Sequence, residues 1–181
     1  MKIHILGAPG AGVTTLGKAL ATQLQIPCFD TDDYYWFTDD LLPYRRRRNP
    51  DHRRSLLTAD LAKQEAWVLS GALCGWGDTL IPQFDAVIWR WLPVELRLQR
   101  IAAREQQRYG PERVAPGGDL HTVFEKFCTW AAAYDDNAEN IRSRPQELAW
   151  LDALSCPVLK IENALELEDL ITYTKSWLST I

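Results

Sequence analysis

The sequence predicts an α/β fold built on a doubly wound, five-stranded parallel sheet with flanking helices. Short apolar runs alternate with segments of helical periodicity along the chain, which is the pattern of a parallel sheet with crossover helices. A glycine-rich turn joins the first apolar run to the first helical segment. No internal repeat, low-complexity tract or linker divides the 181 residues, so we expect a single domain over residues 1–181.

The expected strands are the apolar runs at 2–6, 28–30, 67–70, 86–91 and 158–161. Helices are expected where apolar residues recur every three or four positions, at 14–24, 54–64, 94–109, 120–137, 145–153 and 167–178. Two stretches interrupt this rhythm. Residues 32–54 are acidic, aromatic and arginine-rich, and residues 108–119 are dense in glycine and proline, as expected of a mobile loop or short lid.

Composition limits the function classes. Hydrophobic residues make up 46% and charged residues 24%, an ordinary globular balance, and the net charge of −4 gives no support for a nucleic-acid or membrane-surface binder. The four cysteines form no C-x-x-C pair, so neither a zinc site nor a disulfide framework is expected. No apolar run approaches membrane-spanning length, and the N-terminal run is too short for a signal peptide. We therefore expect a cytoplasmic protein.

Residues 7–15 read G-A-P-G-A-G-V-T-T between the first expected strand and helix. A Walker A loop has the pattern G-x-x-x-x-G-K-[ST] at this place, because its glycines let backbone N–H groups fold around phosphate oxygens. Gly7 and Gly12 hold the glycine positions, Thr14 and Thr15 supply hydroxyls, and Val13 stands where the lysine belongs. The alternative is a plain glycine-rich turn, but strand, glycines, hydroxyls and helix all favour a phosphate-binding loop.

The absence of the Walker A lysine affects phosphate binding and phosphoryl transfer differently. Anion binding comes from converging backbone amides and the positive end of the following helix, which do not depend on the side chain at position 13. The lysine would add a point charge at the β and γ phosphates, where charge spreads during transfer. Lys18 lies five residues further on, about 7.5 Å along the helix and on another face, so it is no replacement. A catalytic protein must obtain that charge elsewhere.

Three segments resemble the adenylate kinase and shikimate kinase branch of the P-loop small-molecule kinases. They read G-A-P-G-A-G at 7–12, F-D-T-D-D at 29–33 and F-D-A-V-I-W-R-W-L-P-V-E-L-R-L-Q-R-I-A-A-R at 84–104. The resemblance implies a P-loop NTPase-type fold with an acceptor insert at about 33–65 and a short lid at about 108–120. The residues that would hold the nucleotide are Gly7, Gly10, Ala11, Gly12, Val13, Thr14 and Thr15.

The same resemblance implies a phosphotransferase that moves the γ-phosphate of MgATP to a small-molecule acceptor, with ATP and Mg²⁺ as cofactors. Because Val13 departs from the pattern, a second function stays open: a non-catalytic nucleotide- or phosphate-binding regulatory module. Beyond the acceptor, no nucleic acid or membrane partner is expected, and a homodimer stays open.

Three acids follow the second expected strand, where ligands of doubly wound sheets bind. In similar kinases an acid here organises Mg²⁺ and positions or deprotonates the acceptor. This makes Asp32 the candidate base, Asp30 with Thr14 the candidate metal residues, and Asp33 a candidate acceptor contact. The alternative is a helix cap or solvated turn, since aspartate is common at both.

Arginines recur at spacings of three and four in the fourth helical segment, at Arg97, Arg100, Arg104 and Arg108. For Arg97 we expect a solvated face. Arg104 and Arg108 lie at the end of this helix that leads into the lid, where similar kinases bring arginines onto the transferring phosphates. We therefore take them as catalytic candidates, and Arg113 in the lid as a further candidate for the missing positive charge.

The remaining candidates surround the acceptor and the base. The glycine-rich segment after the third strand supplies Gly71, Trp76 and Asp78 as acceptor contacts, with a tight turn and a core tryptophan as the alternative. Asn163, after the last strand, is the candidate adenine contact by resemblance. The arginine run at 45–48, followed by Arg53 and Arg54, is open between a solvated charge run and a site for an acidic or phosphorylated acceptor.

Overall fold

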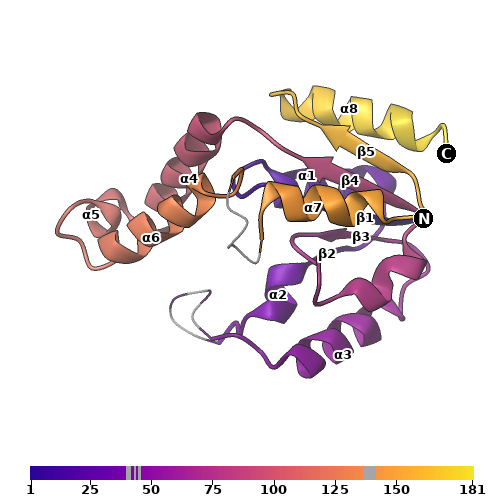
Figure 1. Ribbon diagram of the computed structural model, residues 1–181, viewed down its shortest axis with the longest axis horizontal. Coiled ribbons are helices and arrows are strands. Elements are labelled where there is room, and N and C mark those ends of the chain that lie inside the picture. Colours follow the sequence, from indigo (N-terminus) through magenta and orange to yellow (C-terminus); the bar gives the residue numbers. More distant parts are fainter. Residues whose placement is uncertain (40–41, 43, 45, 137–141) are drawn as a thin grey trace.

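A parallel sheet of five strands organises the chain (Figure 1). The structure is a computed structural model that describes residues 1–39, 42, 44, 46–136 and 142–181. The strands are β1 (Lys2–Gly7), β2 (Cys28–Asp30), β3 (Trp67–Ser70), β4 (Ala86–Arg90) and β5 (Val158–Ile161), in the spatial order β2-β3-β1-β4-β5. All five predicted strands are confirmed, and β2, β3 and β5 have the predicted bounds.

Helices cover both faces of this sheet, which confirms the doubly wound arrangement. They are α1 (Val13–Leu24) and α8 (Leu167–Leu178) on one face, and α3 (Pro50–Leu61) and α7 (Arg144–Asp152) on the other. Ile3 and Ile5 of β1 belong to the first core, whereas Leu6 belongs to the second, because successive strand side chains point to opposite faces. The second core also contains two large indole rings, those of Trp67 and Trp89.

A group of three helices projects from the sheet after β4 (Figure 1). These are α4 (Val94–Tyr109), α5 (Pro111–Val114) and α6 (His121–Ala132). The lid segment predicted at 108–120 lies at the tip of this projection and contains α5 in addition to loop. The end of α5 contacts the start of α6, since a ring nitrogen of His121 lies 3.0 Å from the Val114 carbonyl oxygen.

Helix bounds differ from the prediction where capping decides them. The helix predicted to begin at Arg54 begins at Pro50, because the Asn49 side chain caps it by accepting from the Asp51 N–H at 2.9 Å. The helix predicted over 120–137 is α6, which ends at Ala132, and Asn137 lies outside the described residues. Three short helices were not predicted: α2 (Thr31–Tyr35), α5 and η1 (Asp78–Gln83).

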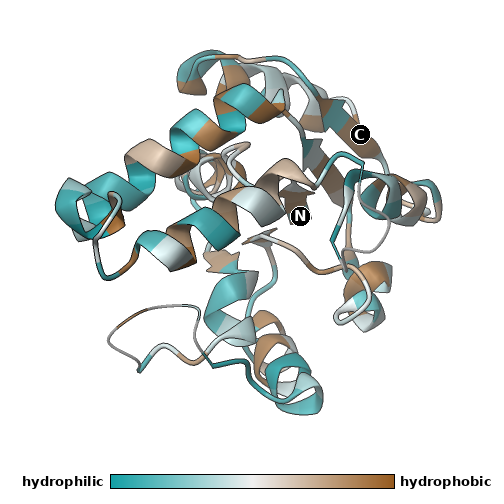
Figure 2. Ribbon diagram, turned by 60° about the vertical axis from the view of Figure 1, so that its left-hand side comes forward, coloured by the Kyte–Doolittle hydropathy of each residue, from teal (hydrophilic) through white to brown (hydrophobic). Residues whose placement is uncertain are grey.

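Hydropathy follows this layering. Figure 2 shows hydrophilic and hydrophobic residues banded along the helices, as expected of elements with one face on a core. Within the ranges that the structure describes, no helix is both long and apolar enough to cross a membrane.

Candidate functional site

The glycine-rich loop lies at the switch point of the sheet. After β1 the chain turns toward the β2 edge, whereas after β4 it leads to β5 on the opposite edge. Ligands of open α/β sheets bind in the crevice between two such strands. Gly7 and Arg90 end these strands as register partners, and the Ala8 N–H donates to the Arg90 carbonyl oxygen at 2.9 Å. The predicted loop therefore occupies the position where this fold binds ligands.

Close backbone contacts explain two of the loop glycines. Gly7 has a φ of +147°, and a Cβ built on it would lie 1.9 Å from the Arg90 carbonyl oxygen. Gly10 has a φ of +83°, and its Cβ would lie 2.6 Å from the Arg97 carbonyl oxygen. Only glycine fits such positions, since both the backbone angle and the space exclude a side chain.

The start of α1 is open toward the mouth of the loop. Gly12 is the residue before the helix, no side chain caps the helix, and no acid lies in its first turn. The first N–H groups of a helix lack intrahelical partners and carry the positive end of the helix dipole. A twelve-residue helix that begins in this way at the end of a glycine-rich loop has the geometry of a phosphate site.

The three residues after Gly12 point in different directions. The Val13 side chain is 8% exposed and packs in the core between α1 and α8. Thr15 is exposed to solvent. The Thr14 hydroxyl donates to Oδ2 of Asp30 at 2.9 Å, which joins the loop to the end of β2. Of the two threonines, Thr14 is thus the one that lies against the acidic segment.

Asp30 caps a helix and also bonds to the glycine-rich loop. Its Oδ1 accepts from the Asp32 N–H at 3.0 Å and so caps α2, while its Oδ2 accepts from Thr14. No group of three or more His, Cys, Asp or Glu side chains within the described ranges could hold a metal ion. Mg²⁺ commonly keeps several waters and uses one or two protein oxygens plus substrate phosphates. The Thr14 and Asp30 oxygens fit that donor set.

Asp32 has an unusual electrostatic environment. Its side chain reaches solvent, yet partial desolvation, followed by the negative charge of Asp30, raises its pKa from 3.8 to about 6. Arg142 acts in the opposite direction and limits the rise. Burial and Asp30 also raise the pKa of Asp33, while the positive charges of Lys18 and Arg48 oppose that rise. A carboxylate that binds and releases its proton near neutral pH suits general-base chemistry.

The arginines of α4 do not form one solvated face. The prediction for Arg97 is wrong: it is fully buried, ion-paired with Asp135, and donates to the carbonyl oxygens of Leu92 at 2.8 Å and Ala131 at 2.9 Å. Helix α4 lies against the loop and α6, which buries this side of the helix. Arg100 is the exposed arginine nearest the loop, since its Nη1 lies 3.9 Å from the Cβ position of Gly12.

The lid arginines lie further along the same projection. Arg104 pairs with Glu105 at 2.8 Å, and Arg113 pairs with Asp119 through two hydrogen bonds of 2.9 and 2.6 Å. The guanidinium of Arg108 lies 5.9 Å from the ring centre of Tyr44 in the insert. In this arrangement Arg108 links the lid to the acceptor insert, whereas Arg104 and Arg113 are engaged within the projection.

The segment after β3 packs mainly on protein. A Cβ on Gly71 would meet the Thr31 hydroxyl at 2.0 Å, so this glycine lets α2 approach the sheet. The Trp76 indole N–H donates to the Ala72 carbonyl oxygen at 2.9 Å. Oδ1 of Asp78 accepts from the Gly75 N–H and the Trp150 indole N–H, each at 2.9 Å.

Among the described arginines of the insert, Arg53 is the one that is buried. Arg53 is 8% exposed, and its guanidinium carbon lies 4.0 Å from the ring centre of Tyr35 and 4.7 Å from that of Trp76. Its buried Nε has no hydrogen-bond partner, and no carboxylate of the described residues pairs with it. By contrast, Arg46, Arg47 and Arg48 are exposed or half-buried near Phe37 and Trp36. Arg45 lies outside the described residues.

Three groups beneath the loop were not among the predicted site residues: Arg90, Arg142 and Glu147. Arg90 donates to the Ala11 carbonyl oxygen at 3.2 Å and to that of Asn163 at 3.3 Å, which places the candidate adenine loop next to the phosphate loop. Arg142 donates to the Gly7 carbonyl oxygen and, at 3.1 Å, to Glu147. A charged residue inside the apolar run A-V-I-W-R-W was the sequence signal for Arg90; the other two had none.

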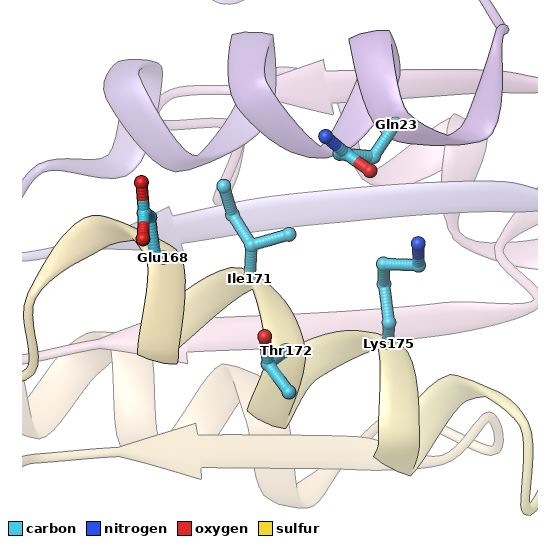
Figure 3. A pocket seen from close by; sticks show the side chains of 5 residues that line it. All are labelled: Gln23, Glu168, Ile171, Thr172 and Lys175. Atoms are coloured by element: carbon cyan, nitrogen blue, oxygen red, sulfur yellow. The ribbon is translucent and has the colours of Figure 1, made fainter.

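A second hollow lies away from the carboxyl ends of the strands. It is a shallow groove between α1 and α8, lined by Gln23, Glu168, Ile171, Thr172 and Lys175 (Figure 3). Its lining mixes one acid, one base and one apolar side chain without a convergent set of donors. The site at the glycine-rich loop therefore remains the candidate.

Two sequence relatives cover most of the chain. The chain is 44% identical over 178 residues to the uncharacterized protein YqaC of Bacillus subtilis, covering 98% of this chain and 97% of that protein. It is 30% identical over 140 residues to a cytidylate kinase of Archaeoglobus fulgidus, covering 72% of this chain and 75% of the kinase. This chain belongs to the P-loop kinase family. No protein-family model matches the sequence.

Solved structures share the fold. A shikimate kinase from Acinetobacter baumannii in complex with shikimate superposes with a TM-score of 0.57 at 16% identity, covering 99% of this chain and 93% of that one. A deoxyadenosine kinase from M. mycoides gives 0.54 at 15% identity, with both chains fully covered. A gluconokinase from Sinorhizobium meliloti gives 0.51 at 15% identity, covering 99% and 91%. At these identities the likeness concerns the P-loop kinase fold.

Proposed function

We propose that the protein is a MgATP-dependent phosphotransferase acting on a small-molecule acceptor. The observation that carries the proposal is the Thr14–Asp30 hydrogen bond at the uncapped start of α1, with the Asp32 carboxyl next to it. A phosphate site, a metal-compatible pair of oxygens and a carboxylate of raised pKa would then lie together, which supports the proposal. Membership in the P-loop kinase family supports the same reading.

The loop residues 7–15 would hold the phosphates of ATP through backbone amides. Mg²⁺, when bound with ATP, would neutralise charge on the β and γ phosphates next to Thr14 and Asp30. Asp32 would take the proton of the acceptor hydroxyl. The acceptor oxygen would then bond to the γ-phosphorus, and the bond between the γ-phosphorus and the β-phosphate oxygen would break, which releases ADP. For a phosphate acceptor, which has no proton to lose near neutral pH, Asp32 would act by positioning alone.

Positive charge at the transferring phosphate would come from α4. Arg100 joins the predicted Arg104 and Arg108 as a candidate, because it is exposed and lies nearest to the loop. A guanidinium suits this task, since it stays charged and binds two phosphate oxygens at once. Asn163 would lie against the adenine, as the contact of its carbonyl oxygen with Arg90 allows.

We further infer that the acceptor carries an anionic group. Arg53 is buried between two aromatic rings with no carboxylate partner in the described part of the chain, and a buried guanidinium without an anion is costly. A phosphate or carboxylate of the acceptor would complete its hydrogen bonds. Asp33, Gly71, Trp76 and Asp78 remain the proposed acceptor contacts around it.

A second candidate function is a regulatory module that binds nucleotide without transferring phosphate. The burial of Val13 in the hydrophobic core favours it, because the apolar side chain at the lysine position brings no charge to the phosphates. A module of this kind would bind MgATP but form no ADP with any acceptor.

Calorimetric titration with ATP, with and without Mg²⁺, tests the shared premise. We expect a Kd in the micromolar to submillimolar range that tightens with Mg²⁺. ADP formation with a panel of phosphorylated and carboxylated acceptors then separates the two functions. The Asp32→Asn variant should bind ATP as the wild type does and lose turnover, and Val13→Lys should raise the rate of phosphoryl transfer. ATP binding without ADP formation across the panel would favour the regulatory module.

A further inference from the structure

Three arginines reach the glycine-rich loop from behind and bind alternate carbonyl groups. Arg142 donates to the carbonyl oxygen of Gly7, Arg97 to that of Pro9 at 3.5 Å, and Arg90 to that of Ala11 at 3.2 and 3.4 Å. Within the same loop the Ala8 N–H donates to the Arg90 carbonyl oxygen and the Ala11 N–H to that of Ala8, whereas the amides of Gly10 and Gly12 donate to no backbone carbonyl of the described residues. The conformation that binds an anion is thus held in place before any ligand arrives.

Two of these arginines are neutralised by buried or half-buried carboxylates. Arg97 pairs with Asp135, which also accepts from the Trp91 indole. Arg142 pairs at 3.1 Å with Glu147, whose Oε2 accepts from the Trp89 indole at 2.8 Å and the Tyr134 hydroxyl at 2.5 Å. Both ion pairs are therefore anchored by further hydrogen bonds.

Arg90 differs from the other two because it has no carboxylate. It is 1% exposed, and its hydrogen bonds go to carbonyl oxygens of Ala11 and Asn163. No acid in the described ranges forms an ion pair with it. Among the described residues, these three guanidiniums and two carboxylates leave one positive charge beneath the loop, and that charge belongs to Arg90.

The mouth of the loop carries a second positive charge. Arg100 lies close to the loop, with its Nη1 3.9 Å from the Cβ position of Gly12. Burial first, and the charge of Arg100 second, lower the pKa of the Arg90 guanidinium to about 10. Two cations near the loop thus repel each other, and an anion bound at the loop would relieve that repulsion.

We propose that Arg90 substitutes for the missing Walker lysine from behind the loop. It is a positioning residue: it fixes the Ala11 carbonyl and keeps one positive charge next to the phosphate site without touching the ligand. The positive charge that a lysine side chain at position 13 would bring is supplied instead by Arg90, at the end of β4. This inference rests on the proposed function, since it requires the loop to bind a polyphosphate.

Calorimetric titration with MgATP and with inorganic triphosphate tests the proposal without relying on turnover. Arg90→Met should weaken binding of both ligands at least tenfold, while Arg90→Lys, which keeps the charge, should stay within about threefold of the wild type. Arg90→Gln loses the positive charge but can still donate one hydrogen bond to the Ala11 carbonyl oxygen. If the methionine variant does not fold, this variant distinguishes the effect of the charge from that of the hydrogen bond. Lys160→Met is the matched control, because Lys160 lies on β5 opposite Trp89 and pairs with Asp152, away from the loop.

A rescue experiment adds a readout that a purely structural role would not move. Val13→Lys should raise the affinity for inorganic triphosphate more in the Arg90→Gln background than in the wild type, because the new lysine restores the charge only where it is missing. If the wild type, Arg90→Met and Arg90→Gln bind MgATP and triphosphate equally well, the role of Arg90 is wrong, whereas the proposed nucleotide site is not affected. A wild-type protein that binds neither MgATP nor triphosphate would overturn both proposals.

Discussion

Replacing Asp32 by asparagine should stabilise the folded protein at neutral pH while removing the proposed base. The pKa of this carboxyl is raised from 3.8 to about 6, first by desolvation and then by Asp30. A difference of about two pH units corresponds to about 3 kcal/mol of unfavourable free energy for the ionised form. Because the side chain reaches solvent, screening reduces the effect, and we expect about 1–2 kcal/mol.

The pH dependence follows from the direction of this change. Between pH 3.8 and 6 the folded protein retains a proton that the unfolded chain releases, so the contribution of Asp32 to stability falls as the pH rises through this window. Above pH 6 Asp32 is ionised in both the folded and the unfolded protein, so its carboxylate destabilises the folded protein to the full extent. The Asp32→Asn variant should therefore gain stability over the wild type at pH 8 and show little difference near pH 3.5.

Urea unfolding at several pH values measures this difference. Asp136→Asn is the control, because Asp136 is exposed and no hydrogen bond or ion pair joins it to another residue that the structure describes. The free energy of unfolding of the control should differ little from the wild type at either pH. If Asp32→Asn is no more stable than the wild type at pH 8, the desolvation argument is wrong. If it gains equally at both pH values, the gain does not come from the carboxylate charge.

Three further variants test other parts of the site. Gly7→Ala should lower the free energy of unfolding by about 3 kcal/mol in urea titrations, because its Cβ would overlap the Arg90 carbonyl at a φ of +147°; an unchanged midpoint would contradict the loop geometry. Thr14→Val should weaken MgATP binding about tenfold and leave ATP binding without Mg²⁺ unchanged, with Thr14→Ser as the conservative control. Arg53→Met should raise the KM for an anionic acceptor at least tenfold, with the calorimetric Kd for ATP as internal control; an unchanged KM would remove Arg53 from the acceptor site.

The sheet and the phosphate loop could be predicted because both follow from local pattern. The apolar runs that became β2, β3 and β5 were found with correct bounds, since a buried parallel strand is a short apolar segment bounded by turns. The spacing of Gly7, Gly12 and Thr14 was enough to locate the loop, because each residue type answers a local requirement of backbone angle or hydroxyl placement.

The polar groups beneath the loop could not be predicted, because their partners lie far apart in the chain. Arg97 was expected on a solvated face from its helical spacing, yet α6 and the loop bury it and Asp135 neutralises it. Arg142 reaches back over 135 residues to Gly7. Helical periodicity describes a helix by itself, and only the packing of α4 against α6 decides which charged residue becomes internal.

A cation fixed behind the loop cannot perform every task of a lysine. The long stem of a lysine can move with the γ-phosphate as charge shifts during transfer, whereas Arg90 is held by carbonyl groups at both ends of its guanidinium. A fixed charge stabilises the bound ground state and the transition state to a similar degree, so it strengthens binding without accelerating the chemical step. We therefore expect Arg90→Gln to raise the KM for ATP at least tenfold with little change in kcat. Arg100→Met should instead lower kcat, because this exposed side chain is free to follow the phosphate. Steady-state kinetics of the two variants would separate these roles, and a fall in kcat for Arg90→Gln equal to that for Arg100→Met would contradict the division.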